Sequence, residues 1–365
     1  MTEKIVFLRL SVGVLIGLLG GALFAALGLP LPWLLGAMAA TSLAALGGVD
    51  FAVPNRLRQV TLAVAGSLIG TSFNPEVLAR MGDWPVTAVL LVGFVVLSVV
   101  LSTVYFRLAA RFDPPTAFMS SVPGGLSIMV ALSDLVGGDG RQVALVQSIR
   151  VLVVVFLIPL FVAVFASPIL GAGQSEGRLA LEIDAAMPAM AAPTMANAWF
   201  VDGFEIALMA GLGFILARII RLPAAYLTGP ILASAVAHGV GWSNAGVPGP
   251  ILFVSFVIIG TSIGARFRGA RIADLRDTGR AALGQLALLL ALSVLAAAAI
   301  SRGFDLPFLA VLLAFAPGGV FEMCLIAIAF NIDPAFVAFH HLLRLGLVMV
   351  VVPLLVPRSP LAPPR

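Results

Sequence analysis

Hydrophobic side chains follow one another in long runs, and most charged residues lie in the short stretches between these runs. A run of about 17–25 apolar residues has the length of a helix that crosses a lipid bilayer. Each half of the chain contains six apolar segments, at about 8–29, 33–49, 57–74, 86–106, 116–137 and 142–168, and at about 203–220, 224–241, 248–265, 281–301, 307–330 and 336–357. The pattern predicts an all-α polytopic membrane protein.

The two halves share an unusual sequence. Pro123-Gly124-Gly125 recurs as Pro317-Gly318-Gly319, and residues 123–160 align without a gap onto 317–354. Proline fixes the first turn of a helix, and the glycines interrupt the helix that precedes it. We therefore predict two membrane repeats, 1–168 and 203–365, joined by a connector at 169–202. Each repeat is expected to contain one broken or re-entrant helix, a feature typical of secondary transporters.

A shorter match supports the duplication. Gly70-Thr71-Ser72 resembles Gly260-Thr261-Ser262, and each triplet belongs to a Gly-x-x-x-Gly pattern. Small residues at this spacing allow membrane helices to pack closely. The match predicts that the two triplets occupy equivalent positions.

Composition excludes several classes of protein. Hydrophobic residues make up 61% of the chain and charged residues 10%, and the mean hydropathy is +1.13. The net charge of +4 comes from arginines in short loops, so it indicates membrane orientation and no nucleic-acid partner. With one cysteine, three histidines and no P-loop, we expect no metal site, no cofactor and no enzymatic activity.

The loop charges predict how the repeats are oriented. Five arginines follow the third segment of the second half, whereas the equivalent loop of the first half, near Glu76, has no positive excess. Positive loops favour the cytoplasm, and the alternation requires an odd number of crossings in each repeat. We therefore predict inverted-topology repeats of about five spanning helices each, with both termini cytoplasmic and the N-terminal segment retained. The Pro-Gly-Gly segment is the one expected not to cross fully, and the short second segment is the alternative.

The broken helices are the first candidate site. The positive end of a helix that begins inside the membrane favours an anion, and an arginine in an apolar segment needs a partner or a ligand. The structural alternatives are a kink that shapes packing, and arginines that reach the interface or neutralise Asp139 or Asp333. The predicted substrate-binding residues are Pro123, Gly124, Gly125, Ser127, Arg150, Pro317, Gly318, Gly319 and Arg344.

Two further residues are candidates for ion coupling. Glu322 follows the second break and has no acidic counterpart in the first repeat. A carboxylate in an apolar segment can exchange a proton during transport, and the alternative is a pairing with Arg344 or His341. His341 is the second coupling candidate, and a structural hydrogen bond is its alternative role.

These residues resemble one known family over nearly the whole chain. The segments 31–36 and 226–230, both Pro-Gly-Gly blocks and the two arginines are similar to the AbrB-like duplicated membrane proteins. That family has two inherited names, a transition-state regulator and an ammonia monooxygenase. The resemblance implies a bacterial inner-membrane protein whose architecture is similar to the inverted-repeat fold of sodium/proton antiporters, bile-acid symporters and glutamate or citrate carriers.

Three functions follow as hypotheses. The first is a secondary transporter of a small organic anion, coupled to H⁺ or Na⁺. The second is a membrane protein that influences gene expression, and a membrane scaffold of this kind needs no polar groups in its apolar segments. The third is an ammonia monooxygenase, which the absence of metal ligands in the sequence disfavours. A homodimer is compatible with the sequence, which does not determine the oligomeric state.

Overall fold

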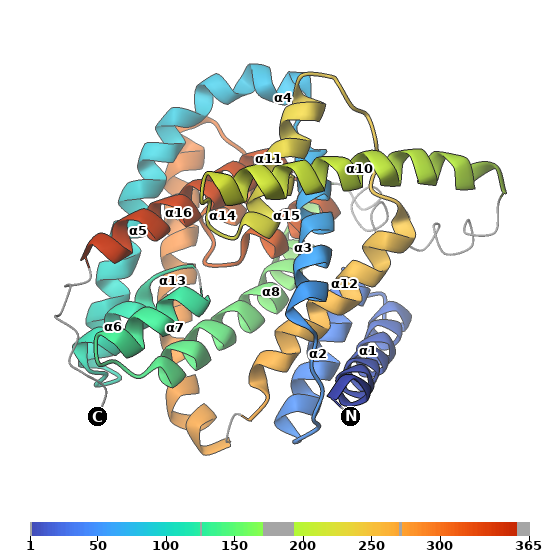
Figure 1. Cartoon of the computed structure of the whole chain (residues 1–365). Coiled ribbons are helices and arrows are strands. Elements are labelled where there is room, and N and C mark those ends of the chain that lie inside the picture. Colours follow the sequence, from blue (N-terminus) through green and yellow to red (C-terminus); the bar gives the residue numbers. More distant parts are fainter. Residues whose placement is uncertain (1, 125, 171–192, 270–271, 356–365) are drawn as a thin grey trace. The chain divides into compact units, whose positions relative to one another are not determined.

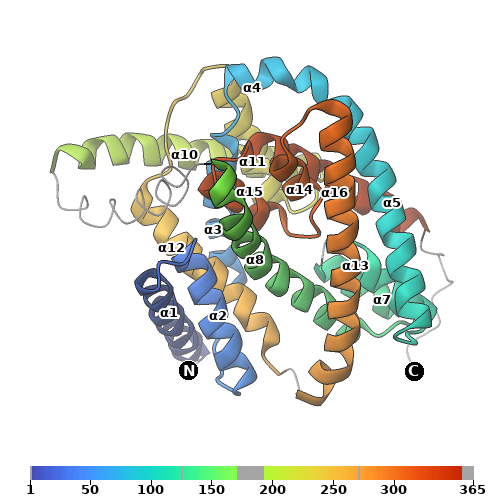
Figure 2. The ribbon, with the colours of Figure 1, turned by 180° about the vertical axis from the view of Figure 1, so that it is seen from behind.

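The computed structural model describes residues 2–124, 126–170, 193–269 and 272–355 (Figures 1 and 2). Within these ranges all regular secondary structure is helical. Seven of the described helical segments are long and apolar enough to cross a membrane: Lys4–Ala26, Pro75–Leu108, Gly140–Val162, Trp199–Ile219, Gly249–Phe267, Arg276–Phe304 and Pro334–Leu355. The expected all-α polytopic membrane protein is confirmed.

The order of helices in the first half recurs in the second. The first series is α1 (Thr2–Ala26), α2 (Pro32–Leu46), α3 (Asn55–Gly70), α5 (Trp84–Leu108), α6 (Pro114–Ser121), α7 (Leu126–Leu135) and α8 (Gly140–Leu170). The second series is α10 (Pro193–Ile219), α11 (Ala225–Gly239), α12 (Gly249–Gly264), α13 (Ile272–Phe304), α14 (Phe308–Phe315), α15 (Val320–Ala329) and α16 (Pro334–Leu355). Short pieces α4 (Pro75–Arg80), η1 (Met81–Asp83) and η2 (Ala265–Phe267) complete the described elements.

Matching helices begin in the same way because their local sequences match. The residues before α2 and α11, Leu31 and Ala224, both adopt left-handed backbone with φ of 48° and 49°. Proline precedes both α3 and α12. The paired short helices also agree in length, at 15 residues for α2 and α11 and 16 for α3 and α12.

The structure corrects the predicted register of the third helices. Gly70 ends α3 and Gly264 ends α12, so Gly70 is equivalent to Gly264 and not to Gly260. The matched triplets are thus offset by one helical turn. The triplet match was misleading because the Gly-x-x-x-Gly spacing offers two alignments one turn apart.

The chain divides into two compact units, and each contains parts of both repeats. Unit 1 consists of Met1–Trp84, Leu152–Arg271 and Val320–Ala338, and unit 2 consists of Pro85–Val151, Ile272–Gly319 and Phe339–Arg365. Helices α8 and α16 contribute to both units. The compact units are therefore distinct from the sequence repeats predicted at 1–168 and 203–365.

In unit 1 the repeats pack reciprocally. Helix α3 packs on α11, and its counterpart α12 packs on α2. The contacts are equivalent: Gly66 lies against the carbonyl oxygen of Leu227, and Gly260 against that of Leu34. Helix α1 in turn packs on α2, as both views show (Figures 1 and 2), and α10 packs on α11. The glycines permit these approaches because they have no side chain.

Equivalent helices of unit 1 run in opposite directions. Helix α12 runs parallel to α2, since Gly260 contacts Leu34 and Gly264 contacts Thr41. A short loop joins the end of α2 to the start of α3, so α12 ends where α3 begins. The loop residue Asp50 confirms this arrangement, because its carboxylate lies 2.6 Å from Arg9 and 3.2 Å from Arg268, which follows α12.

Unit 2 contains both Pro-Gly-Gly breaks and an aromatic core. The ring of Phe315, the last residue of α14, lies 5.2 Å from that of Phe94 on α5. The same ring lies 6.0 Å from His340 on α16, and the His340 Nε2 lies 2.9 Å from the hydroxyl of Thr87. These contacts fix the helix that precedes the second break against α5 and α16.

Candidate functional site

The two predicted breaks exist. Helix α6 ends at Ser121 and α7 begins at residue 126, while α14 ends at Phe315 and α15 begins at Val320. The residue before each proline, Val122 or Ala316, adopts extended backbone with ψ of 124° or 146°. Proline disfavours helical backbone at the residue before it, so the sequence itself ends each helix at this point.

Both breaks meet at one cavity in unit 2. The space open to the centre of a water molecule is about 10 Å³, which accommodates roughly one water. The residues that line the cavity are Phe94, Val95, Ser98, Ser121, Pro123, Leu289, Ser293, Phe315, Pro317 and Arg344. Pro123, Pro317 and Arg344 were predicted from the sequence to belong to one site, and the structure places these three together.

Arg344 is held by the second break. Its Nη1 donates to the carbonyl oxygen of Ala316 at 2.7 Å, and its Nη2 donates to that of Gly318 at 2.5 Å. Nη2 also lies 2.8 Å from Nδ1 of His341. The guanidinium therefore satisfies carbonyl groups that the interrupted helix leaves without an intrahelical partner.

His341 orients this arginine and has an equivalent in the first repeat. Its Nε2 lies 2.9 Å from the carbonyl oxygen of Leu313. In the first repeat Gln147 occupies the matching position, and its Nε2 donates to the carbonyl oxygen of Met119 at 3.1 Å. The two side chains make the same contact one turn before each break, which agrees with the structural hydrogen bond considered as the alternative for His341.

Arg150 is buried without the contacts that Arg344 makes. Its side chain is 4% exposed, and its Nε and Nη1 have no hydrogen-bond partner. It lies close enough to Arg344 for the two positive charges to repel each other. An unpaired charge in an apolar interior costs on the order of several kcal/mol, so Arg150 is the least satisfied of the predicted site residues.

Buried hydroxyls surround the breaks. Ser121 and Ser293 donate to backbone carbonyl oxygens, those of Ala117 and Leu289. The Oγ atoms of Ser98 and Ser120 are buried and have no partner. Ser98 lines the cavity, and no pattern in the sequence distinguishes it because a lone serine in an apolar helix is common.

The remaining predicted binding residues have varied positions. Gly124 has a φ of +148°, and a Cβ atom placed on it would lie 3.8 Å from the side chains of Leu345 and Val348 on α16. The carbonyl oxygen of Gly318 accepts from Arg344. Gly319 directly precedes α15. Gly125 and the side chain of Ser127 lie outside the described residues.

The aspartates considered as partners of the arginines have another role. The Oδ1 of Asp139 accepts from the backbone N–H of Gln142, and that of Asp333 accepts from the N–H groups of Ala335 and Phe336. Each aspartate thus caps the start of α8 or α16. Among the described residues, neither arginine forms an ion pair with a carboxylate.

Glu322 belongs to unit 1, where its neighbour is Arg266. Glu322 on α15 is 9% exposed, and its carboxylate is close enough to Arg266 to attract it. Arg266 in turn interacts with Arg58 and Tyr226, which lie at the starts of α3 and α11. The sequence pattern suggested Arg344 and His341 as alternative partners of Glu322, and Arg266 belonged to the loop charges that indicate orientation. The electrostatic attraction between Arg266 and Glu322 was missed because the two residues are distant in sequence.

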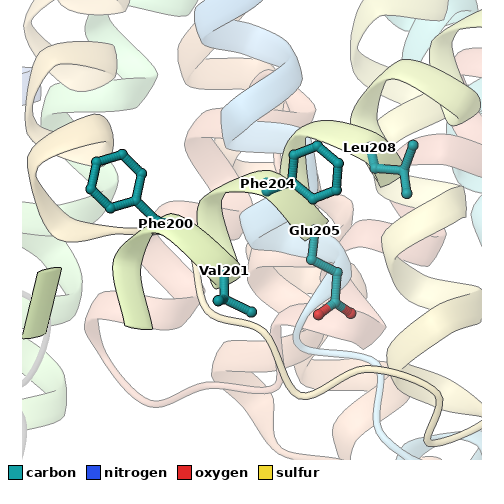
Figure 3. Close-up of a pocket in the computed structure, with 5 residues that line it drawn as sticks. All are labelled: Phe200, Val201, Phe204, Glu205 and Leu208. Atoms are coloured by element: carbon teal, nitrogen blue, oxygen red, sulfur yellow. The ribbon is translucent and has the colours of Figure 1, made fainter. Parts of the chain in front are cut away.

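A second hollow lies on α10 and is less suited to a ligand. Its volume is about 440 Å³, and it is lined by Phe200, Val201, Phe204, Glu205 and Leu208. Figure 3 shows these side chains along one stretch of the helix. Phe200 and Phe204 are 78% and 73% exposed, as expected for a helix face covered by lipid.

No group of three or more potential metal ligands occurs among the described residues.

The apolar spans, the recurring order of helices and the paired breaks define a multi-pass helical membrane protein with an internal duplication. Residues 33–358 match the family model described as "Transition state regulatory protein AbrB". The chain belongs to this family, and the resemblance recognised in the sequence is confirmed.

Two relatives cover most of the chain. "Uncharacterized protein YhjN" of Bacillus subtilis (strain 168) is 27% identical over 308 residues, which are 80% of this chain and 75% of the relative. "Putative regulator AbrB" of Escherichia coli (strain K12) is 27% identical over 336 residues, 90% of each chain. No solved structure matches the chain.

Proposed function

We propose that the protein is a secondary transporter that moves a small organic anion across the bacterial inner membrane, coupled to H⁺ or Na⁺. The observation that supports this most directly is the meeting of both Pro-Gly-Gly breaks at one cavity, beside a buried arginine. Interrupted helices present unpaired backbone groups inside the membrane, and such groups bind substrates and ions in secondary transporters. A membrane protein without a translocated ligand has no need for this arrangement.

The opposed directions of α3 and α12 support inverted-topology repeats. Helices that are equivalent in sequence are expected to run antiparallel when the two halves cross the membrane in opposite directions. Arg9 and Arg268 meet Asp50 at one end of unit 1. We assign this end, and with it the N-terminus, to the cytoplasm because positively charged loops are retained there, and the charge alternation assigns the C-terminus to the same side.

Glu322 is the coupling residue in this proposal. Glu322 is buried, is close enough to Arg266 for the opposite charges to attract, and lies in the first turn of α15, which follows the second break. A proton or Na⁺ on the carboxylate would weaken its attraction to Arg266, so ion binding would change the contacts of α15. Because α15 adjoins the Pro-Gly-Gly break in sequence, this change is suited to coupling. His341 is held by Leu313 and Arg344, and we assign it a structural role.

The experiment uses the purified full-length protein. A thermal-shift screen tests carboxylates against amines at equal ionic strength, and the carboxylates that stabilise the protein are then offered to proteoliposomes with an imposed pH or Na⁺ gradient. Binding raises stability by about 2.7 kcal/mol at a ligand concentration of roughly 100 Kd. We expect at least one carboxylate to stabilise the protein and to accumulate with the gradient. A complete absence of both effects across the panel would contradict the transport proposal and favour a regulatory or scaffold role.

A further inference from the structure

The interior of unit 2 carries positive charge that no carboxylate balances. Among the described arginine, lysine, aspartate and glutamate side chains, the buried ones are Arg150, Glu322 and Arg344. Glu322 belongs to unit 1, so unit 2 buries two arginines, which lie close enough to repel each other. The carboxylates of unit 2 whose side chains are described are all exposed: Asp113, Asp134, Asp139, Asp277 and Asp305. A buried charge is costly unless an opposite charge accompanies it.

The cavity in unit 2 offers donors to a negatively charged group. Arg344 lines it and is 6% exposed. A guanidinium has five N–H groups, and within the described residues three of those on Arg344 contact Ala316, Gly318 and His341, which leaves two available. Ser98 also lines the cavity, is 4% exposed, and has an Oγ without a partner.

The other two serines of the lining are not available as donors. The hydroxyl of Ser121 donates to the carbonyl oxygen of Ala117, and that of Ser293 donates to Leu289. A hydroxyl has one proton to donate. The polar donors that remain for a ligand in this cavity are therefore Arg344 and Ser98.

The size and the charge of the cavity limit what it can hold. The space open to the centre of a water molecule is about 10 Å³, so about one particle of that size fits. The rings of Phe94 and Phe315 contact each other, with centroids 5.2 Å apart, and leave no room between them for an organic body. Two positive charges disfavour a cation, and a water molecule cannot neutralise them. A halide ion is only slightly larger than water and carries the required charge.

We propose that this cavity binds one chloride ion, which accepts from Arg344 and from the Ser98 hydroxyl and balances the buried arginine charge. Pro123 and Pro317 line the same cavity, so the ion lies beside both Pro-Gly-Gly breaks and stabilises their meeting. This inference goes beyond the proposed function, because chloride is neither the organic substrate nor the coupling cation. It holds for a transporter and for a protein with another role.

The test uses the purified full-length protein in detergent, in gluconate buffer whose gluconate is replaced stepwise by chloride at constant ionic strength. The melting temperature is expected to rise by a few degrees and then to level off, because a ligand that binds only the folded protein stabilises it. Bromide should act like chloride, and formate and acetate should act less. Broadening of the chlorine NMR signal by the protein measures binding without unfolding it.

Matched serine variants locate the ion. Ser98→Ala removes a hydroxyl that has no partner, so its melting temperature without chloride should equal or slightly exceed that of the wild type. It should need about 10-fold more chloride for half of the stabilisation, since a hydrogen bond to a charged group is lost. Ser120→Ala is the control, because the Oγ of Ser120 is also buried without a partner and Ser120 is not among the lining residues. Its response to chloride should equal that of the wild type.

Variants of Arg344 test the role of charge. Arg344→Lys keeps the positive charge and loses the planar fork, so the response to chloride should weaken, whereas Arg344→Gln removes the charge and should abolish it. Both variants lose contacts with the second break, so each shift is measured from the variant's own melting temperature without chloride. Where Arg344→Gln does not fold, Arg344→Lys and the two serine variants decide.

Three results would overturn the inference. A melting temperature and an NMR line width that do not depend on chloride would show that the cavity holds water only. An unchanged response in Ser98→Ala, or an equal loss in Ser98→Ala and Ser120→Ala, would show that the ion binds elsewhere. Stronger stabilisation by formate or acetate than by chloride would assign the cavity to a carboxylate group. None of these results decides the transport proposal, which depends on the uptake assay, and a failed uptake assay would leave the chloride site standing.

Discussion

The tight packing of α1 on α2, and of α10 on α11, permits a prediction that does not depend on function. A Cβ atom placed on Gly36 would lie 2.6 Å from the carbonyl carbon of Gly20, and one placed on Gly229 would lie 2.6 Å from that of Gly213. We predict that Gly36→Ala and Gly229→Ala each destabilise the protein, and by similar amounts, because the two sites are equivalent in the repeats.

The magnitude follows from the geometry. Ordinary contact begins at 3.4 Å, and the carbonyl oxygen of each partner glycine would lie closer still than its carbon. The two helices of each pair must therefore separate by at least about 0.8 Å, because backbone atoms cannot rotate away as a side chain would. A gap of about 0.5–1 Å forfeits roughly a quarter to a half of the dispersion energy of the atoms beside it, and overpacking costs about 1–3 kcal/mol. Alanine favours a helix over glycine by about 1 kcal/mol, so the net loss of stability is expected to reach about 2 kcal/mol.

The assay is thermal unfolding of purified full-length variants, with Gly93→Ala as the control. Gly93 lies in α5, and a Cβ atom placed on it would have no other atom within 4 Å, so this variant should be neutral or stabilised by about 0.5–1 kcal/mol. Melting temperatures for Gly36→Ala and Gly229→Ala equal to that of Gly93→Ala would refute the close packing. A large effect at only one of the two sites would refute their equivalence.

Three further predictions can be tested on the same preparations. In a Cys324→Ala background, cysteines introduced at the exposed positions Glu76 and Arg268 should react with a membrane-impermeant reagent from opposite sides of the membrane; labelling from one side would rule out inverted repeats. Glu322→Gln should bind the substrate within about threefold of wild type and lose uptake driven by a pH gradient, and uptake that still follows the gradient would exclude this residue as the proton site. His341→Gln introduces the residue that the first repeat has at this position, so the free energy of unfolding should change by less than about 1 kcal/mol, and a larger loss would show that the histidine has a specific role.

Much of the fold could be predicted from the sequence because its causes are local. Apolar runs and the prolines of each Pro-Gly-Gly block determine where helices exist and where they are interrupted, since hydropathy and the restriction that proline places on Val122 and Ala316 act within a few residues. The duplication could also be predicted, because the Pro-Gly-Gly block recurs at matching positions in both halves of the sequence. The positions of the breaks needed no tertiary information.

The alignment of α3 with α12 and the hydrogen-bond partners of the two buried arginines depended on contacts between distant segments. The Gly-x-x-x-Gly pattern is compatible with two alignments one turn apart, and only the packing of Gly66 and Gly260 on the opposite repeat selects one. Likewise, an arginine that recurs at the same position in both repeats is expected from the sequence to have the same role twice. The two arginines differ because Arg344 donates to the carbonyl oxygens of Ala316 and Gly318, whereas Nε and Nη1 of Arg150 have no hydrogen-bond partner.

The charged residue that attracts Glu322 could likewise not be predicted from the sequence. Its sequence neighbours are apolar, so the pattern indicates a buried carboxylate but cannot name its partner. The fold brings it to Arg266 within unit 1, a residue that the sequence had suggested was only an orientation signal. The positions of the helix breaks were thus determined by the sequence alone, because they depend on neighbouring residues. Which buried charges come close enough to attract each other was decided by the tertiary structure, because it depends on which helices meet.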